Sequence, residues 1–374
     1  MKPDIENYDT DALCVLPLCP VFKTCLGCSF QNISYSEELN WKQAYLQKIF
    51  KAAGFAGIPE PIVASAEEYN YRNRIDLKLL RTKTNEILVG FTPQNHRGIL
   101  PISACYIARR EISDFIPELT RQVRATLPAR YRVANLVVRT GEEGKVFWGG
   151  IGKRSLRQSP ENYFSATIRS RKIFYSLETF FQANLSILPK LFATIETLPI
   201  WGQKTGEKQP TVDNRQKTPN DNQNKPRLFD LYGGVGLFGI GLADLARQVV
   251  LVEENPASIK LCHHNAHYNG LTNFEIKSGK MEEHLDILNF SDKNNSAVAI
   301  IDPPRAGLSS SALAMFKNAT GFQHLLYLSC QPEALIRDLN GLVSGGWQIQ
   351  RVMPFDFFPK TKHIETLAWL TKWI

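Results

Sequence analysis

The chain has 374 residues, of which 43% are hydrophobic and 21% charged, and its formal net charge is +8. This is the composition of an ordinary folded protein, and no run approaches the ~18 consecutive apolar residues that a membrane helix needs. Because one hydrophobic core rarely grows beyond ~250–300 residues, we expect two domains. The acidic, polar start of the chain is unlike a signal peptide, so we expect a cytoplasmic protein without a membrane partner.

The first 35 residues are loop-like and rich in cysteine. Cys19, Cys25 and Cys28 follow one another closely, and Cys105 lies far along the chain in ISACYI. In a cytosolic chain such thiols favour metal binding or catalysis over disulfide formation. Four thiolates suit a tetrahedral zinc ion or an iron–sulfur cluster, and the spacing alone slightly favours zinc.

The segment from residue 36 to 54 predicts one helix. Its apolar side chains recur at helical spacing, and Gly54 is suited to end it. We expect this helix to pack on the catalytic domain at the C-terminal end of the chain.

Residues 55–175 predict a central α+β domain that is strongly basic. Short runs alternate apolar and polar residues, as in Ile75, Leu77 and Leu79, which is typical of β-strands. Between positions 71 and 172 there are 20 Lys or Arg against 8 Asp or Glu. This excess indicates a module that binds a polyanion such as RNA, although a solvated basic surface fits the charge almost as well.

Residues 203–226 contain one aliphatic side chain, Val212, and no aromatic one. Such a segment cannot bury enough surface to offset the entropy of ordering it, so we expect a disordered insert. An additional RNA-contacting arm is the functional alternative, and a neutral surface loop is the simpler interpretation.

The remainder of residues 176–374 alternates short buried runs with helical or polar segments. The runs include LFDL, VVLVE, AVAIID and LLYLSC. This alternation predicts βαβ units and an α/β fold with a doubly wound, Rossmann-like parallel sheet.

The first βα turn of this domain carries the sequence DLYGGVGLFG, from residue 230 to 239. Its glycines allow close backbone approach to a ligand, but their spacing fits neither a dinucleotide fingerprint nor a phosphate loop. Glu253 follows the next strand and is placed to accept hydrogen bonds from ribose hydroxyls. The pattern therefore favours an S-adenosylmethionine site, with Tyr232 and Gly234 in its turn.

Several chemically active side chains follow strands of the same sheet. Cys330 lies in LSCQP, Asp302 in DPPR, Glu365 in FDFFPKTKHIE and Gln182 in FFQAN. Uracil C5 becomes nucleophilic when a thiolate adds to C6, and the C5 proton must then be removed by a base. Cys330 suits the nucleophile and Glu365 the base, while Asp302 and Gln182 suit contacts with the base edge. Taken individually, each residue also has an ordinary interpretation: Cys330 as a buried structural thiol, and Glu365 as an acid on the surface.

These motifs together resemble the RNA uracil-5-methyltransferases, over the chain from about Cys19 to the C-terminus. The resemblance rests on FFQAN, DLYGGVGLFG, DPPRAGL, SCQP and FDFFPKTKHIE, and on YRNR (71–74), which resembles a motif of the family's RNA-binding region. It implies that Cys330 is the nucleophile, Glu365 the proton acceptor and Asp302 a substrate contact. It also implies that Gln182, Tyr232, Glu253 and Asp302 surround the cofactor and target base.

The resemblance changes the expected metal and suggests a substrate. Family members that modify ribosomal RNA carry a [4Fe-4S] cluster on the cysteine pattern of this chain, so we expect a cluster in place of zinc. The same pattern, with no room before Cys19 for the β-barrel domain of some ribosomal members, favours 23S rRNA over the tRNA T-loop. We expect a monomer that binds a flipped uridine.

Some positions depart from the family pattern, and two other functions compete. Gly233 stands where Cys is usual, and Phe357 and Lys360 replace the commoner Met and Gln before the base. An adenine amino-group methyltransferase would place an aromatic residue after Asp-Pro-Pro, where this chain has Arg305. A non-catalytic RNA-binding assembly factor would not need to keep Cys330, Asp302 and Glu365.

Overall fold

The computed structural model describes residues 15–55, 57, 59–126, 131–150, 162–202, 224–284, 287 and 297–372. The insert predicted at 203–226 lies outside the described residues, apart from its last three positions. Within the described part of the chain, no helix is both long enough and apolar enough to cross a membrane.

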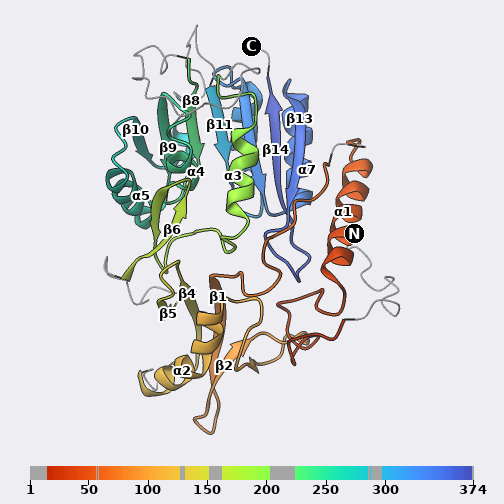
Figure 1. Cartoon of the computed structure of the whole chain (residues 1–374), viewed down its shortest axis with the longest axis vertical. Coiled ribbons are helices and arrows are strands. Elements are labelled where there is room, and N and C mark those ends of the chain that lie inside the picture. The colour runs from red at the N-terminus through yellow and green to blue at the C-terminus, as the bar shows by residue number, and fades with distance from the viewer. Residues whose placement is uncertain are drawn as a thin grey trace, which may run out of the picture.

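A seven-stranded sheet forms the upper body of the molecule (Figure 1). Its strand order is β10-β9-β8-β11-β12-β14-β13, with β14 antiparallel to both of its neighbours. The strands are β8 (Arg227–Leu231), β9 (Gln248–Glu253), β10 (Phe274–Ser278), β11 (Ala297–Ile301), β12 (His324–Ser329), β13 (Gln348–Phe355) and β14 (Glu365–Thr371). The predicted parallel sheet is therefore present on five strands, and an antiparallel strand lies beside β12.

Helices cover both faces of this sheet because its central strands are apolar on both sides; all five residues of β11 are buried. One face packs against α3 (Leu188–Glu196), α4 (Leu237–Gly241) and α5 (Pro256–Tyr268). The other packs against α1 (Tyr35–Ala52), α6 (Ser310–Asn318) and α7 (Pro332–Ser344). A short 3₁₀ helix, Met281–Glu283, follows β10.

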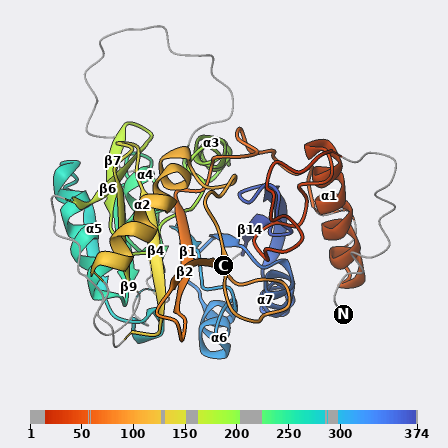
Figure 2. The same cartoon turned by 90° about the horizontal axis from the view of Figure 1, so that it is seen from below.

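The predicted N-terminal helix is α1, and it belongs to the core of the seven-stranded sheet. Leu46 and Phe50 are fully buried with side chains of β8, β9 and β12. Ser34 caps the helix by accepting a hydrogen bond from the Glu37 N–H. Thus a segment from the start of the chain packs beside the strands that end it, as Figures 1 and 2 both show.

The central domain is a five-stranded antiparallel sheet covered by one helix, below the seven-stranded sheet in Figure 1. The buried Ile75, Leu77 and Leu79 pack against the helix, as their alternation predicted. Its strand order is β3-β2-β1-β4-β5, and its elements are β1 (Arg74–Arg81), β2 (Ile87–Phe91), β3 (Leu100–Pro101), α2 (Arg110–Thr126), β4 (Val133–Thr140) and β5 (Val146–Gly150).

The hairpin of β6 (Phe164–Ile168) and β7 (Arg171–Tyr175) joins the two domains. Our sequence boundary placed it in the central domain, but its apolar side chains lie in the core of the seven-stranded sheet. Arg169 and Arg171 both pair with Asp244, which follows α4. Part of the basic charge of the central segment is thus used to dock the hairpin and is not free for RNA.

Candidate functional site

The carboxyl ends of the parallel strands bring the predicted reactive residues to one edge. Asp302 directly follows β11 and Cys330 directly follows β12. Because β14 is antiparallel, its first residue, Glu365, starts at this same edge, where Ser329 is paired with Thr366. The antiparallel strand is the reason that a residue near the C-terminus lies beside the thiol.

Acidic groups at this edge stay protonated more readily than usual. Burial, reinforced by the neighbouring Asp230, raises the pKa of Asp302 to about 7. Burial and the charge of Asp302 also raise the pKa of Glu365 well above its ordinary value, and Arg305 opposes this shift. The Oε1 atom of Glu365 is buried and has no hydrogen-bond partner in the described structure. Such an unsatisfied carboxylate oxygen is what a proton acceptor facing a substrate site requires.

The Cys330 thiol lies between charges of both signs. Burial raises its pKa to about 11, and Glu365 and Asp302 raise it further, while a hydrogen bond and the positive charge of Arg305 lower it. We proposed Arg305 only as a residue that distinguishes this site from adenine methyltransferases. The positive charge of Arg305 favours the thiolate form of Cys330.

The loop that carries Gln182 is held by the central domain. The Gln182 amide donates to Asp302 Oδ2 at 3.1 Å, and its own backbone oxygen accepts from Asn73 Nδ2 at 3.0 Å. Arg139 is fully buried and donates to the carbonyl oxygens of Ser176, Thr179 and Phe181. The predicted contact residue is therefore fixed at its backbone and at its side chain.

An exposed aromatic residue lies two positions before Gln182. Phe180 is 65% exposed, whereas Phe181 is buried and stacks on Tyr175 with ring centroids 4.2 Å apart. An aromatic side chain left in solvent on a rigid loop is suited to stack on a nucleobase. Our reading of FFQAN had singled out only Gln182.

The YRNR motif is largely interior. Tyr71 and Asn73 are buried, and the Tyr71 hydroxyl donates to the carbonyl of Pro359 in the turn before Glu365. The Arg72 backbone bridges to Asn184 and Ala108. The motif therefore ties the central domain to both loops of the site, and its tyrosine and asparagine are not displayed for RNA.

The glycine turn and Glu253 form one unit, as a cofactor site requires. Glu253 Oε2 accepts from the Gly234 N–H at 2.9 Å, and Asp230 accepts from the Gly239 N–H at 2.7 Å. The space beside the Gly234 α-carbon is open, and its φ is +56°. Tyr232 has a φ of +67°, a conformation that is costly for a bulky residue. These residues fit the amino-acid and ribose ends of S-adenosylmethionine.

The predicted cysteine ligands come together in space. A cavity of about 200 Å³ is lined by Cys19, Cys25, Cys28 and Cys105. Burial raises the pKa of Cys28 to about 12, and the other three thiols add to the shift. Within the described part of the chain, no three Cys, His, Asp or Glu side chains gather closely enough to hold a single metal ion.

The fold, together with the residues at the carboxyl ends of the parallel strands, defines a class of protein. A seven-stranded sheet with a glycine turn after its first strand, an acid after its second and an antiparallel strand beside its fifth is a Rossmann-like methyltransferase domain. A family model described as tRNA (uracil-5-)-methyltransferase matches residues 217–373. The C-terminal part of the chain is therefore similar to the RNA uracil-5-methyltransferases.

Individual relatives differ in the RNA that their names specify. The 23S rRNA (uracil(1939)-C(5))-methyltransferase of Vibrio parahaemolyticus is 27% identical, over 96% of this chain and 82% of that protein. The tRNA (uracil(54)-C(5))-methyltransferase of Schizosaccharomyces pombe is 26% identical, over 100% of this chain and 68% of that protein. The crystal structure of Pyrococcus abyssi tRNA (uracil-54, C5)-methyltransferase with S-adenosyl-L-homocysteine matches with a TM-score of 0.67 and 21% identity, over 93% of this chain and 86% of that one. That structure shares the fold.

Proposed function

We propose that this protein methylates C5 of a specific uridine in RNA, with S-adenosylmethionine as methyl donor. One observation carries the proposal. The Cys330 thiol, the unsatisfied Glu365 carboxylate and Asp302 lie at one sheet edge, beside a glycine turn suited to the cofactor. The non-catalytic alternative gives no reason to keep a buried, unsatisfied carboxylate next to a thiol.

In the proposed first step Cys330 adds to C6 of the uracil. At neutral pH the raised pKa keeps most of the thiol protonated, so its reactivity depends on Arg305. Gln182 and Asp302, joined by a hydrogen bond, hold the polar edge of the ring. Phe180 provides a face on which the unstacked base rests.

In the proposed last step Glu365 removes the C5 proton, and the bond between Cys330 and C6 then breaks. A carboxylate with a raised pKa is a stronger base than an ordinary glutamate, and Arg305 keeps part of it ionised. When bound, S-adenosylmethionine supplies the sulfonium methyl that C5 takes. Glu253 and the turn at Gly234 hold its ribose and amino-acid ends.

We further propose that Cys19, Cys25, Cys28 and Cys105 hold a [4Fe-4S] cluster. A zinc ion needs four sulfur atoms about 2.3 Å from one centre. Here the four thiols line one cavity of about 200 Å³, and the resemblance of their spacing to that of cluster-bearing family members favours the cluster over zinc. Anaerobic reconstitution with iron and sulfide should give four irons per chain in the wild type and a loss of cluster absorbance in Cys105→Ser. Stoichiometric zinc in the purified protein, without iron, would return the site to zinc.

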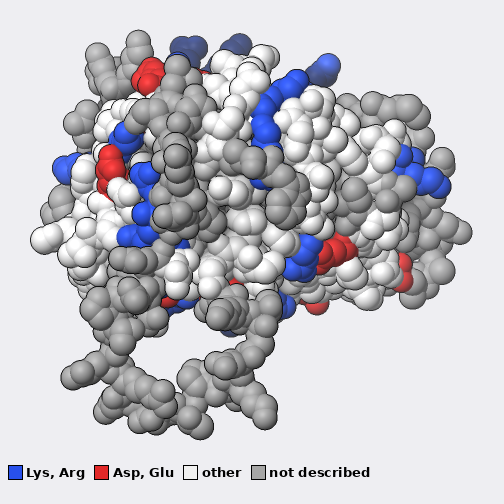
Figure 3. Space-filling view, turned by 90° about the horizontal axis from the view of Figure 1, so that it is seen from above, with Lys and Arg blue, Asp and Glu red and all other residues white. Residues whose placement is uncertain are grey.

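The proposed RNA is 23S rRNA. The resemblance of the cysteine pattern to ribosomal members supports it, as does the Vibrio relative, which carries that activity in its name. The Schizosaccharomyces relative, named for tRNA, spans the whole chain and keeps the tRNA T-loop as the alternative. Among the described residues, the face opposite the central domain shows Lys and Arg in separate groups, with acidic residues beside some of them (Figure 3). We propose that RNA binds from the central-domain side, because the segment from 71 to 172 carries 20 Lys or Arg against 8 Asp or Glu.

The test is methyl transfer from labelled S-adenosylmethionine to unmodified 23S rRNA and tRNA transcripts, followed by nucleoside mass spectrometry. We expect 5-methyluridine in 23S rRNA. Cys330→Ala should abolish turnover and retain RNA binding. Glu365→Gln should accumulate a covalent RNA adduct that survives denaturing electrophoresis.

Each other outcome has a definite meaning. Product in tRNA alone would keep the chemistry and replace the substrate. Full activity of Cys330→Ala would exclude the covalent mechanism. If neither transcript is methylated by protein with intact metal content, the non-catalytic assembly factor becomes the better account.

A further inference from the structure

The turn that leads into Glu365 is held, residue by residue, by segments far away in the sequence. It runs from residue 356 to 364 and joins β13 to β14, and Phe355 is paired with Glu365 across the two strands. Asp356 is therefore the first residue beyond the pair that contains the proposed base. Its placement sets the end of the ladder on which Glu365 lies.

Polar contacts reach five consecutive residues of this turn. Lys42 Nζ donates to Asp356 Oδ1 at 2.7 Å and to the Phe358 carbonyl at 3.2 Å. Asn184 and Tyr71 donate to the carbonyls of Phe357 and Pro359. The Lys360 carbonyl accepts from two backbone N–H groups of the cysteine loop, and its own N–H donates to Glu38 Oε1 at 2.7 Å.

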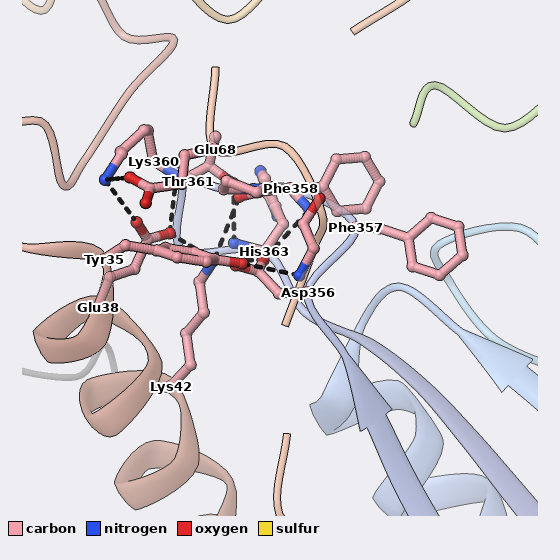
Figure 4. A network of polar contacts seen from close by, with 12 residues as sticks. Tyr35, Glu38, Lys42, Glu68, Asp356, Phe357, Phe358, Lys360, Thr361 and His363 are labelled. Carbon is pink, nitrogen blue, oxygen red and sulfur yellow. Dashed lines mark hydrogen bonds and ion pairs between the residues drawn. The ribbon is translucent and has the colours of Figure 1, made fainter. Parts of the chain in front are cut away.

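The α1 contribution to this set is an ion network with no access to solvent (Figure 4). Lys42, Glu38 and Asp356 are all fully buried, and Lys42 Nζ lies 2.7 Å from a carboxylate oxygen of each acid. At the far end of the turn Lys360 lies 3.7 Å from Glu38 and 3.1 Å from Glu68. Burying three charges is costly, and it does not stabilise a fold more than apolar packing would. A buried ion network of this kind therefore indicates that the positions of its partners are fixed, and it says much less about the stability of the fold.

Resting on the proposed function, we propose that Glu38, Lys42 and Asp356 are positioning residues for the proton-removal step. Their hydrogen bonds and ion pairs reach the turn and one another. Lys42 fixes the start of the turn, and Glu38 fixes Lys360 near its tip. With both points held, the first residue of β14 presents its carboxylate at the edge where Cys330 lies.

Removal of the ammonium should move the turn. In Lys42→Met the Asp356 carboxylate would lose its cation and keep only neutral partners, the Phe358 N–H and the Tyr35 hydroxyl. Hydration of that charge requires the turn to shift outward, and a shift of about 1 Å at a reacting group costs roughly a hundredfold in rate. Addition of Cys330 depends on β12 and should not change.

The experiment separates the two steps with the RNA transcript that the wild type methylates. Under single-turnover conditions, adduct formation and release of free 5-methyluridine RNA are followed on denaturing gels. Lys42→Met should form adduct within about twofold of the wild-type rate and release product at least tenfold more slowly, so adduct accumulates. With [5-²H]uridine in the RNA, release should show a larger isotope effect than in the wild type, because proton removal has become limiting.

Two further variants keep the test decisive. Glu38→Gln/Lys42→Met/Asp356→Asn removes the three fully buried charges and leaves Lys360 paired with Glu68, so it should fold. It too should accumulate adduct because the turn has lost its ionic anchor. Arg351→Met is the matched control, since its ion pair with Glu60 is half-exposed and lies on β13 away from the turn. This control should show wild-type release.

The outcomes are distinct. Equal slowing of adduct formation and release in Lys42→Met and in the triple variant would overturn the positioning role and leave a structural one. Wild-type release in both would overturn it as well. A Glu365→Gln protein that forms no adduct, with a wild type that makes no 5-methyluridine, would overturn the proposed function and this inference together.

Discussion

Two fully buried cations, Arg139 and Lys42, hold the two loops that face the site. The groups that bind Arg139 differ in kind from those that bind Lys42. Arg139 donates to three backbone carbonyls of the loop before Gln182, while Lys42 donates to two carboxylates and one carbonyl around the turn before Glu365. Burial lowers the pKa of Arg139 to about 9. Burial and the nearby Asp356 raise the pKa of Glu38 to about 7, against the opposing charge of Lys42. A cation held by dipoles is insensitive to acid, whereas one held by carboxylates depends on their ionisation.

Among the variants that test this difference between Arg139 and Lys42, Lys42→Met should have the largest effect on stability. At pH 8 it leaves two buried carboxylates without their cation and should lower the free energy of unfolding by about 3–5 kcal/mol. The pKa of Glu38, which burial already raises to about 7, should rise further because Lys42 no longer lowers it. The folded state then binds more protons than the unfolded state, so stability falls as pH rises from about 4 past 7. Urea unfolding at pH 5.5 and 8 should show the smaller loss at pH 5.5. Equal losses would mean that removing Lys42 does not change the number of protons that the folded protein binds between these two pH values.

Arg139→Met should cost somewhat less and show no such pH dependence. It leaves three buried carbonyls without a donor, worth about 2–4 kcal/mol in total. No carboxylate is left uncompensated, so the loss should be the same at pH 5.5 and 8 by urea unfolding. Its control is Arg74→Met on the paired position of β1, whose ion pair with Asp76 is partly exposed and worth at most about 1 kcal/mol. A strongly pH-dependent loss in Arg139→Met would contradict the dipole account.

The neutral triple variant Glu38→Gln/Lys42→Met/Asp356→Asn should recover most of what Lys42→Met loses. Replacement of every member of a buried ion network is often close to neutral, so we expect stability within about 1–2 kcal/mol of the wild type. Its unfolding free energy should not vary between pH 5.5 and 8 through these residues. If the triple variant is as unstable as Lys42→Met, the hydrogen-bond geometry matters more than the charge.

Lys360→Gln should have the smallest effect. Its backbone bonds to Glu38 and to the cysteine loop remain, and Lys42 still lies 2.7 Å from Glu38, whereas the buried Lys360 ammonium is 3.7 Å away. The remaining pair with Glu68 is partly exposed, so the loss should be about 1 kcal/mol. Thermal unfolding beside the wild type measures it. A loss comparable to that of Lys42→Met would mean that the tip of the turn, and not its start, carries the anchor.

The sequence was sufficient to predict the parallel sheet and to place Asp302 and Cys330 at the ends of its strands. Apolar runs such as AVAIID are recognisable because both faces of a parallel sheet are buried, and Asp302 and Cys330 follow such runs directly. The roles of Cys330 and Glu365 came from recognition of the motifs around them, and they stay predictions until the variants are made.

The rest could not be predicted because it depends on contacts between distant segments. Glu38 and Lys42 are spaced like an exposed helical ion pair, and only the docking of α1 against a turn 314 residues away buries them. Tyr71 and Asn73 resemble RNA contacts in sequence and are interior in the structure. The β6–β7 hairpin has the alternation of the central strands, yet it packs on the other domain. A periodicity identifies a buried face without identifying what covers it.

The docking of α1 on the last hairpin has a consequence for biosynthesis. The helix is synthesised long before its partners: β8, β9 and β12 come later in the chain, and the turn that holds Asp356 comes near its end. At ~5–20 residues per second, the 314 residues between Lys42 and Asp356 take some tens of seconds to translate. Until then the helix lacks part of the native surface that covers it. The proposed base is consequently fixed in place only when both ends of the polypeptide have met, so no nascent fragment carries a complete site.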